Sequence, residues 1–307
     1  MLSRYATFTS CTNNYRQYLT AQLNSMAYHG HADLDVHVLV MDMEEEYLSK
    51  LVSKNWPFQL FLHRDSAVNY EHVISRGGLI PKKTRYKFVA DVLKQSLGYG
   101  AILFLDVDLM FAANIMPFLE LVSGTPYILG CNERFKWNMS KYTLQEQPLP
   151  DINMHWMICN APMFMPPLYA NDFWGIAWDT ALNLRKVKDG QSPSDLYTMN
   201  VALWRADIHR NVIPLPNYAW TGVHNGYVNM YTRLEKKGDR WQSVNGEPVY
   251  MIHGRWDKPE CDRFYLKEQE KRYAELGMPE NVKDKHRKLT KKTFQLIKDE
   301  FARFSEL

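Results

Sequence analysis

Two aspartates at the end of an apolar run are the residues of this chain best suited to chemistry. Asp106 and Asp108 follow Ala101–Leu105, five consecutive apolar residues. Such a run is typical of a strand that is buried on both faces, and charges at its end are costly unless a partner compensates them. Alternate residues of an extended segment point the same way, so both carboxylates can offer oxygens to one cation. The spacing therefore predicts a divalent metal site.

A second group of polar residues follows another apolar strand, at 249–252. His253 is a potential metal ligand, Gly254 allows close approach of the backbone, and Lys258 suits a phosphate. A histidine after an apolar strand is also common as a structural residue, so both roles stay open for His253.

A basic helix is predicted just before the aspartates. Pro81 stands where helices begin, and Gly98 follows the last apolar position of the pattern. A helix over 82–98 would run antiparallel to a strand over 101–106, which brings its first turns to the end where Asp106 lies. Those turns contain Lys82, Lys83, Arg85 and Lys87. Cations at a helix N-terminus suit a diphosphate, although a solvated basic face is the alternative.

The elements that position these residues alternate between strand and helix. The pattern predicts strands at 4–9, 36–41, 58–62 and 101–106, with helices at 14–28, 44–54 and 82–98. Residues 63–80 read as a loop, strands between 137 and 230 look short, and the chain is helical after Pro259. This alternation indicates an α/β sheet, mostly parallel, in one continuous domain.

Composition limits the classes of protein that the chain fits. Of its 307 residues, 46% are hydrophobic and 23% are charged, which is typical of a globular protein. No run approaches the roughly 18 apolar residues of a membrane span. Residues 5–9 favour a strand over a signal peptide, and the four cysteines lack metal-site spacing. We therefore expect a cytoplasmic protein.

The net charge of +3 is concentrated at the C-terminus. Residues 281–307 hold eight Lys or Arg and four Asp or Glu, a balance of +4, so residues 1–280 sum to −1. An apolar stripe recurs there at helical spacing, formed by Phe294, Ile297, Phe301 and Phe304. It fits either a helix on an anionic membrane or a helix that closes the protein's own core. Nucleic acid is disfavoured, because no basic surface interleaved with aromatic residues accompanies it.

Taken together, these features resemble the retaining glycosyltransferases of the glycogenin and bacterial lipooligosaccharide galactosyltransferase group. The shared pattern is Asp-x-Asp closing a strand, a basic helix start before it and a His-Gly…Lys-Pro segment at 253–259. Residues 9–15 resemble the family's nucleotide loop, 159–163 its Asn-Ala/Ser-Gly strand and 195–200 its Asp-Gln-x-x-Leu-Asn helix start. The resemblance covers residues 4–259.

The resemblance implies a glycosyltransferase, most simply a hexosyltransferase, that moves a sugar from a UDP-sugar to an acceptor hydroxyl with retention. The acceptor would be a glycan, a glycolipid or another hydroxyl compound. Implied ligands of Mn²⁺ or Mg²⁺ are Asp106, Asp108 and His253. Implied catalytic residues are Asp195, Asn160 and Lys258. Implied donor contacts are Thr9, Tyr15, Lys83, Lys87, Asp106, Val107, Gly254 and Lys258.

The implied architecture is a single α/β domain of the GT-A fold, with a mixed, mostly parallel central sheet and a helical C-terminal tail. The catalytic domain would cover 1–260, with a nucleotide-binding half at 1–111 and an acceptor-binding half at 112–260. A basic helical extension would follow at 261–307, with peripheral membrane contact as one of its two interpretations.

The chain departs from the family pattern at three positions. Lys87 stands where the family has an Arg, so its phosphate contact would be a point charge rather than a fork. Pro162 replaces a Gly. Leu196 replaces the Gln linked to the retaining mechanism, so the sequence constrains the stereochemistry less than it constrains donor binding.

Three other functions stay open on the residues alone. An inverting GT-A enzyme needs a general base, and Asp151, Asp195 and Asp257 are available. A sugar nucleotidyltransferase is expected to carry a Gly-rich loop after its first strand, whereas residues 10–14 contain no Gly. The third is a non-catalytic carbohydrate- or phosphate-binding protein of the same fold.

Overall fold

The structure is a computed structural model of the whole chain. It describes residues 4–64, 80–95, 98–133, 137–154, 157–215, 220–222, 234–243, 245–254, 267, 269–271 and 273–307. Side chains are described for these residues except 80–83, 132–133, 157, 159–160 and 220–222. The loop predicted at 63–80 falls almost entirely outside the described residues.

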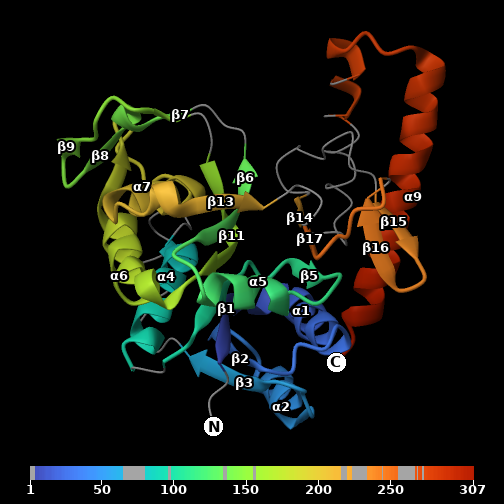
Figure 1. Cartoon of the computed structure of the whole chain (residues 1–307), viewed down its shortest axis with the longest axis horizontal. Coiled ribbons are helices and arrows are strands. Elements are labelled where there is room, and N and C mark those ends of the chain that lie inside the picture. Colours follow the sequence, from blue (N-terminus) through green and yellow to red (C-terminus); the bar gives the residue numbers. More distant parts are fainter. Residues whose placement is uncertain are drawn as a thin grey trace.

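A central sheet organises the described part of the chain, where it has seven strands in the order β13-β6-β11-β4-β1-β2-β3 (Figure 1). Neighbours among β1 to β4 are parallel, as are β13 and β6, whereas β11 runs antiparallel to both β4 and β6. The strands are β1 (Tyr5–Thr12), β2 (Leu34–Met41), β3 (Gln59–Arg64), β4 (Ala101–Phe104), β6 (Ile128–Glu133), β11 (Met157–Met165) and β13 (Val212–Leu215). The prediction of a mixed, mostly parallel sheet is confirmed.

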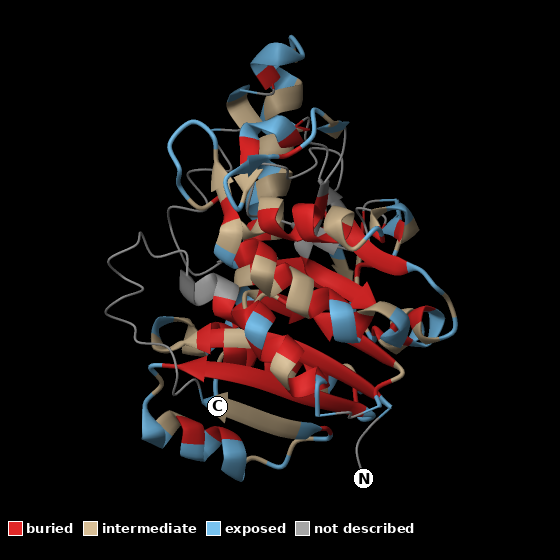
Figure 2. Cartoon of the chain, turned by 90° about the vertical axis from the view of Figure 1, so that its left-hand side faces the viewer, coloured by how far each residue is buried: buried red, intermediate tan, exposed pale blue. Residues whose placement is uncertain are grey.

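Helices enclose this sheet. All residues of β2 and β4 are buried, and Figure 2 shows the buried strands between helices whose outer faces are exposed. One group of helices, packed together, comprises α4 (Ile80–Leu93), α6 (Pro167–Asn183) and α7 (Asp195–Arg205). A second group comprises α1 (Arg16–Tyr28), which follows the short helix η1 (Asn13–Tyr15), with α2 (Glu45–Ser53) and α5 (Met116–Ser123). Leu19, Leu23 and Met26, spaced three or four residues apart on α1, are buried in the core.

Smaller sheets surround the central one. β5 (Leu109–Phe111), β17 (Met251–His253) and β14 (Trp220–Gly222) form a three-stranded sheet. A lobe at the upper left of Figure 1 contains β7 (Trp137–Asn138), η2 (Met139–Lys141), β8 (Tyr142–Leu144), β9 (Gln147–Pro148), β10 (Asn153–Met154) and β12 (Leu184–Lys186). Helix η3 (His209–Asn211) precedes β13. The lobe has its own small core around Trp137, Met139 and Leu184. Its strands have two or three residues, as predicted, whereas β11 of the central sheet has nine, so the prediction of short strands over 137–230 is wrong for β11.

The C-terminal helix packs on the protein itself. α9 (Glu280–Phe304) runs beside the hairpin of β15 (Leu234–Lys237) and β16 (Arg240–Ser243), and its end reaches α1 (Figure 1). Its predicted apolar stripe is buried against Tyr18, Met110, Trp241 and Ile252. Of the two interpretations of this stripe, closure of the core is confirmed. Within the described residues, no helix is both long and apolar enough to span a bilayer.

Candidate functional site

Two carboxylates and one imidazole converge beside the carboxyl end of β4. Asp106, Asp108 and His253 each offer a ligand atom, and these atoms lie within 4.8 Å of one another. His253 Nε2 is 3.0 Å from Asp108 Oδ1 and 3.8 Å from Asp106 Oδ2. Two hard oxygen donors and one imidazole nitrogen suit Mn²⁺ or Mg²⁺ in type and number, since such ions keep further positions for phosphate or water. The residues present therefore fit a divalent cation.

Strand pairing brings His253 to the aspartates from far along the chain. β17 is antiparallel to β5 with His253 opposite Leu109, the residue after Asp108. The next amide continues the contact, because Gly254 N–H donates to the Asp108 carbonyl at 2.9 Å. Gly254 has a φ of 142°, a conformation that favours glycine. The backbone thus fixes His253, at the end of β17, beside the loop that carries the two carboxylates.

The local geometry of the two aspartates differs from the prediction. The strand expected over 101–106 ends at Phe104, and the chain turns at Val107 and Asp108 before β5 begins. Leu105 N–H still bonds the Phe8 carbonyl at 2.9 Å, after which the backbone leaves the sheet. The carboxylates therefore meet across a turn and not along an extended segment, while the predicted convergence itself is observed.

Arg85 is a cationic residue of α4 whose side chain reaches this site. Its guanidinium bonds Asp106 Oδ1 through Nη1 and Asp195 Oδ2 through Nη2, the second at 2.9 Å. The side chain is only 5% exposed, so this is a buried bridge between two carboxylates. An arginine suits that task because its planar fork can bond two oxygens at once.

The electrostatics of Arg85 follow from this burial. Burial alone lowers the pKa of a guanidinium, but the facing carboxylates, Asp106 foremost, outweigh it and raise the pKa of Arg85 above its ordinary value. Its guanidinium carbon also lies 4.8 Å from the centre of the Phe104 ring. Arg85 therefore stays charged at any working pH.

The prediction assigned donor contacts on this helix to Lys83 and Lys87. In the structure the Lys87 side chain is exposed and pairs with Asp91 one turn along α4. The reason is helical phase, since Arg85 shares its face with the buried Val89, whereas Lys87 points outward. This helical periodicity can be read from the sequence, and it could have identified Arg85 as the cation on the buried face of the helix. Lys82 and Lys83 have side chains outside the described ones.

Asp195 begins α7 as the sequence predicted. Its Oδ1 accepts the N–H of Leu196 at 3.0 Å, which leaves Oδ2 directed at Arg85. One turn further, the amide of Asn200 bonds both backbone groups of Ile158, at 3.0 Å from N and 2.8 Å to O. Ile158 immediately precedes an irregularity in the pairing of β11 with β6, which contains residues 159–162. Asn200 thus holds the strand next to Asn160, whose own side chain is not among those described.

The remaining predicted donor contacts lie in several environments. Thr9 is buried in β1 and Tyr15 is half-buried at the start of α1, with its ring 5.5 Å from that of Tyr18. Val107 is half-buried in the turn between the two aspartates. Lys258 lies outside the described residues, as does Asp257. No role of these residues is tested by the geometry.

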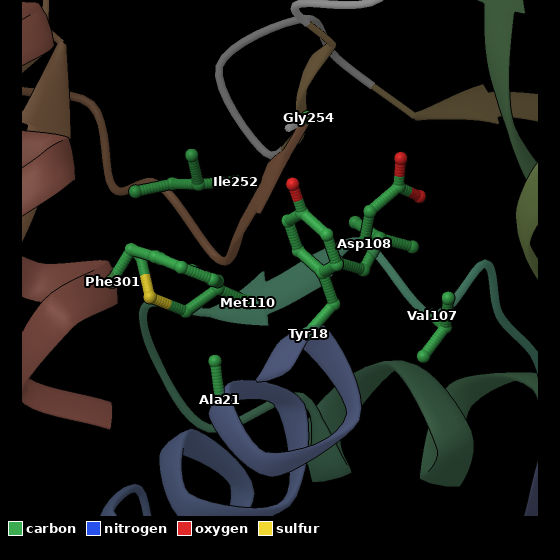
Figure 3. A pocket seen from close by; sticks show the side chains of 9 residues that line it. Tyr18, Ala21, Val107, Asp108, Met110, Ile252, Gly254 and Phe301 are labelled. Carbon is green, nitrogen blue, oxygen red and sulfur yellow. The ribbon is translucent and has the colours of Figure 1, made fainter. Parts of the chain in front are cut away.

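A small pocket adjoins Asp108 on the side of α1 and α9. Tyr18, Val107, Gly254 and Phe301 are among its lining residues. In Figure 3 the Tyr18 ring rises from α1 toward the segment that carries Asp108, while Phe301 reaches in from α9. The C-terminal helix is therefore a direct neighbour of the candidate metal site.

Several solved structures share this architecture. The first is WbbM, a bifunctional glycosyltransferase, with a TM-score of 0.52 and 13% identity over 85% of this chain and 49% of that chain. The galactosyltransferase LgtC, solved with donor and acceptor sugar analogues, has a TM-score of 0.53 and 17% identity over 86% of this chain and 95% of its own. An active-site mutant of LgtC gives 0.50 and 13% over 84% and 93%.

The chain has the GT-A fold. This agreement confirms the fold implied by the sequence resemblance. The chain spans about half the length of WbbM. No protein-family model matches the sequence, and no curated protein matches it in a sequence search. The fold is shown by structure alone, and activity is argued below from the site.

Proposed function

We propose that this protein is a metal-dependent glycosyltransferase that moves a sugar from a nucleoside diphosphate sugar to an acceptor hydroxyl. The convergence of Asp106, Asp108 and His253 at the carboxyl end of a central parallel strand carries this proposal. In open α/β sheets, ligands bind at that edge. The GT-A fold shared with LgtC, which was solved with donor and acceptor sugar analogues, supports the same assignment.

Each residue of the site has a role that its geometry supports. Asp106, Asp108 and His253 would hold Mn²⁺ or Mg²⁺, which when bound supplies Lewis-acid stabilisation of a diphosphate leaving group. Arg85 forms ion pairs with Asp106 and Asp195 and so holds the Asp195 carboxylate beside the metal site. Asp195, 20% exposed, is then placed to accept a hydrogen bond from a sugar hydroxyl.

The donor, the stereochemistry and the remaining contacts follow from the sequence resemblance. We propose a UDP-sugar donor, retention of configuration, stacking of the base on Tyr15, and phosphate contacts from Lys258 and Lys83. Asn160 and Lys258 would act with Asp195 in the reaction, and Thr9, Val107 and Gly254 would contact the donor. The acceptor would be a glycan, a glycolipid or another hydroxyl compound.

We also propose that separate segments of the chain bind the nucleotide and the acceptor, as predicted from the sequence. Residues 1–111 would bind the nucleotide, 112–260 the acceptor, and 261–307 would form an extension. Support for the first boundary is that Asp106 and Asp108 belong to the first half, whereas the lobe with its separate core, around Trp137, belongs to the second. Contact of 281–307 with a membrane stays a prediction, and it would have to use a face of α9 other than the buried stripe.

The test is release of free nucleoside diphosphate from a panel of UDP-, GDP- and dTDP-sugars, with Mn²⁺ and with excess EDTA. We expect UDP release that EDTA abolishes. Asp108→Asn and His253→Ala should each lower the rate by at least about tenfold, because ligand loss weakens the metal site. Asp172→Asn makes the same chemical change on an exposed face of α6 and should leave the rate unchanged.

Each alternative function gives a different outcome. Full, EDTA-insensitive activity of Asp108→Asn would reject the proposed metal site. Formation of pyrophosphate from a nucleoside triphosphate and a sugar 1-phosphate, with no nucleoside diphosphate released from the donor panel, would indicate a nucleotidyltransferase. Binding of donor without turnover, with every acceptor class tried, would indicate a binding protein. The anomeric configuration of the product, read by NMR, separates retention from inversion.

A further inference from the structure

The edge of β5 that faces away from β17 is completed by side chains of α1. On one side, β5 pairs with β17 through backbone hydrogen bonds. On the α1 side, Gln22 Nε2 donates to the Leu109 carbonyl at 3.2 Å, and Phe111 N–H donates to Ser25 Oγ at 3.0 Å. Two polar side chains of a helix therefore take the place of a neighbouring strand along the segment that follows Asp108.

Gln22 makes a second hydrogen bond, to the backbone at the start of the loop that carries the two aspartates. The same Nε2 donates to the carbonyl of Asp106 at 2.8 Å. One buried amide, 1% exposed, thus joins the backbone of the first aspartate to the first residue of β5. Val107 and Asp108 lie between these two attachments. With Gly254 N–H bound to the Asp108 carbonyl at 2.9 Å, the turn is held at its start, its middle and its end.

This restraint has a clear physical use. Two carboxylates whose oxygens approach within the same 4.8 Å as the imidazole repel one another before a cation arrives. A loop that relaxed to separate them would have to be re-formed on binding, at a cost in affinity. Gln22 resists that relaxation with neutral donors on the backbone, so it leaves the carboxylate oxygens available to the cation.

We propose that Gln22 is a positioning residue that preorganises the Asp106–Asp108 turn for divalent cation binding. The inference rests on the proposed metal-dependent function but adds to it a residue remote from the ligand set. Residues that orient metal ligands typically contribute about 10- to 100-fold to metal affinity. Gln22 acts on the backbone of one ligand and of the residue after the other, and we expect about a tenfold effect.

The experiment measures Mn²⁺ affinity directly, by the EPR signal of free Mn²⁺ during titration in the presence of UDP. Gln22→Met keeps the length and burial of the side chain and removes the donors. Thr20→Val is the matched control, because Thr20 is a buried polar residue of the same helix that bonds Tyr47 of α2, away from the loop. The apparent melting temperature of each variant, without metal, reports its loss of stability.

We expect Gln22→Met to bind Mn²⁺ about tenfold more weakly than wild type, and Thr20→Val to bind within about twofold of wild type at similar stability loss. Equal Mn²⁺ affinity of Gln22→Met and wild type would overturn the role of Gln22 while leaving the proposed function intact. Absence of Mn²⁺ binding by wild type would overturn both. Should Gln22→Met not fold, Gln22→Asn decides the question, since its shorter amide cannot span both carbonyls. Wild-type affinity of that variant would reject the proposal.

Discussion

His31 is a buried histidine at the junction of α1 and α5, and we expect its protonation to destabilise the protein in acid. Its Nε2 accepts the N–H of Ile115 at 3.0 Å, so the ring proton must sit on Nδ1, which donates to the Met26 carbonyl at 2.8 Å. A second proton on Nε2 would face an N–H donor. Burial accordingly lowers the pKa of His31 from 6.5 to about 4.

The magnitude follows from linkage. The unfolded chain takes up the proton first, because its pKa is the higher one, so the stabilisation is complete above about pH 7 and is lost as the pH falls toward 4. The full difference between 6.5 and about 4 corresponds to about 3 kcal/mol, at about 1.36 kcal/mol per pH unit. Of this, about 2 kcal/mol is lost on going from pH 8 to pH 5.

Urea unfolding at pH 8 and pH 5 tests this value with the variant His31→Gln. Glutamine can accept from Ile115 and donate to Met26 but does not titrate. Wild type should lose about 2 kcal/mol more than the variant between the two pH values, while other titrating groups contribute equally to both proteins. The comparison at pH 8 reports any packing defect of the variant. Equal losses in the two proteins would refute the assigned pKa shift.

Three further substitutions probe the scaffold of the site. Arg85→Lys should lower the free energy of unfolding by about 1–3 kcal/mol, since a point charge cannot serve both carboxylates; an unchanged urea midpoint would contradict the bridge. Asn200→Leu removes both bonds to the Ile158 backbone and should cost about 2–4 kcal/mol at neutral pH, measured in the same way; a cost under about 0.5 kcal/mol would mean that β11 holds its shape unaided. Phe301→Ala should lower the free energy of unfolding by about 3–5 kcal/mol and weaken Mn²⁺ binding, because Phe301 lines the pocket beside Asp108. Destabilisation with unchanged Mn²⁺ affinity would show that α9 does not influence metal binding.

Local patterns in the sequence were sufficient to predict most elements of the first half of the chain. Apolar runs and helical periodicity marked β1, β2, β4, α1 and α2 to within a few residues. Pro81 and Gly98 indicated the two ends of the basic helix, which in the structure begins at Ile80 and ends at Leu93. The spacing of Phe294 and Phe301 predicted a one-sided helix at the C-terminus. These features depend on neighbours within a few positions, which is why they can be read from one sequence.

Contacts between distant segments were decided only by the tertiary structure. The sequence supplied Asp106, Asp108 and His253, but the antiparallel register of β17 on β5 places the imidazole 3.0 Å from a carboxylate. Which cation of α4 reaches the site depended on the packing of that helix, which buries Arg85 and leaves Lys87 in solvent. The role of Gln22 could not be predicted from the sequence, because the function of an amide side chain in a helix depends on hydrogen-bond partners that only the structure identifies. The residue types determine which chemistry the side chains can perform, and the long-range packing of helices and strands determines which of these side chains come into contact.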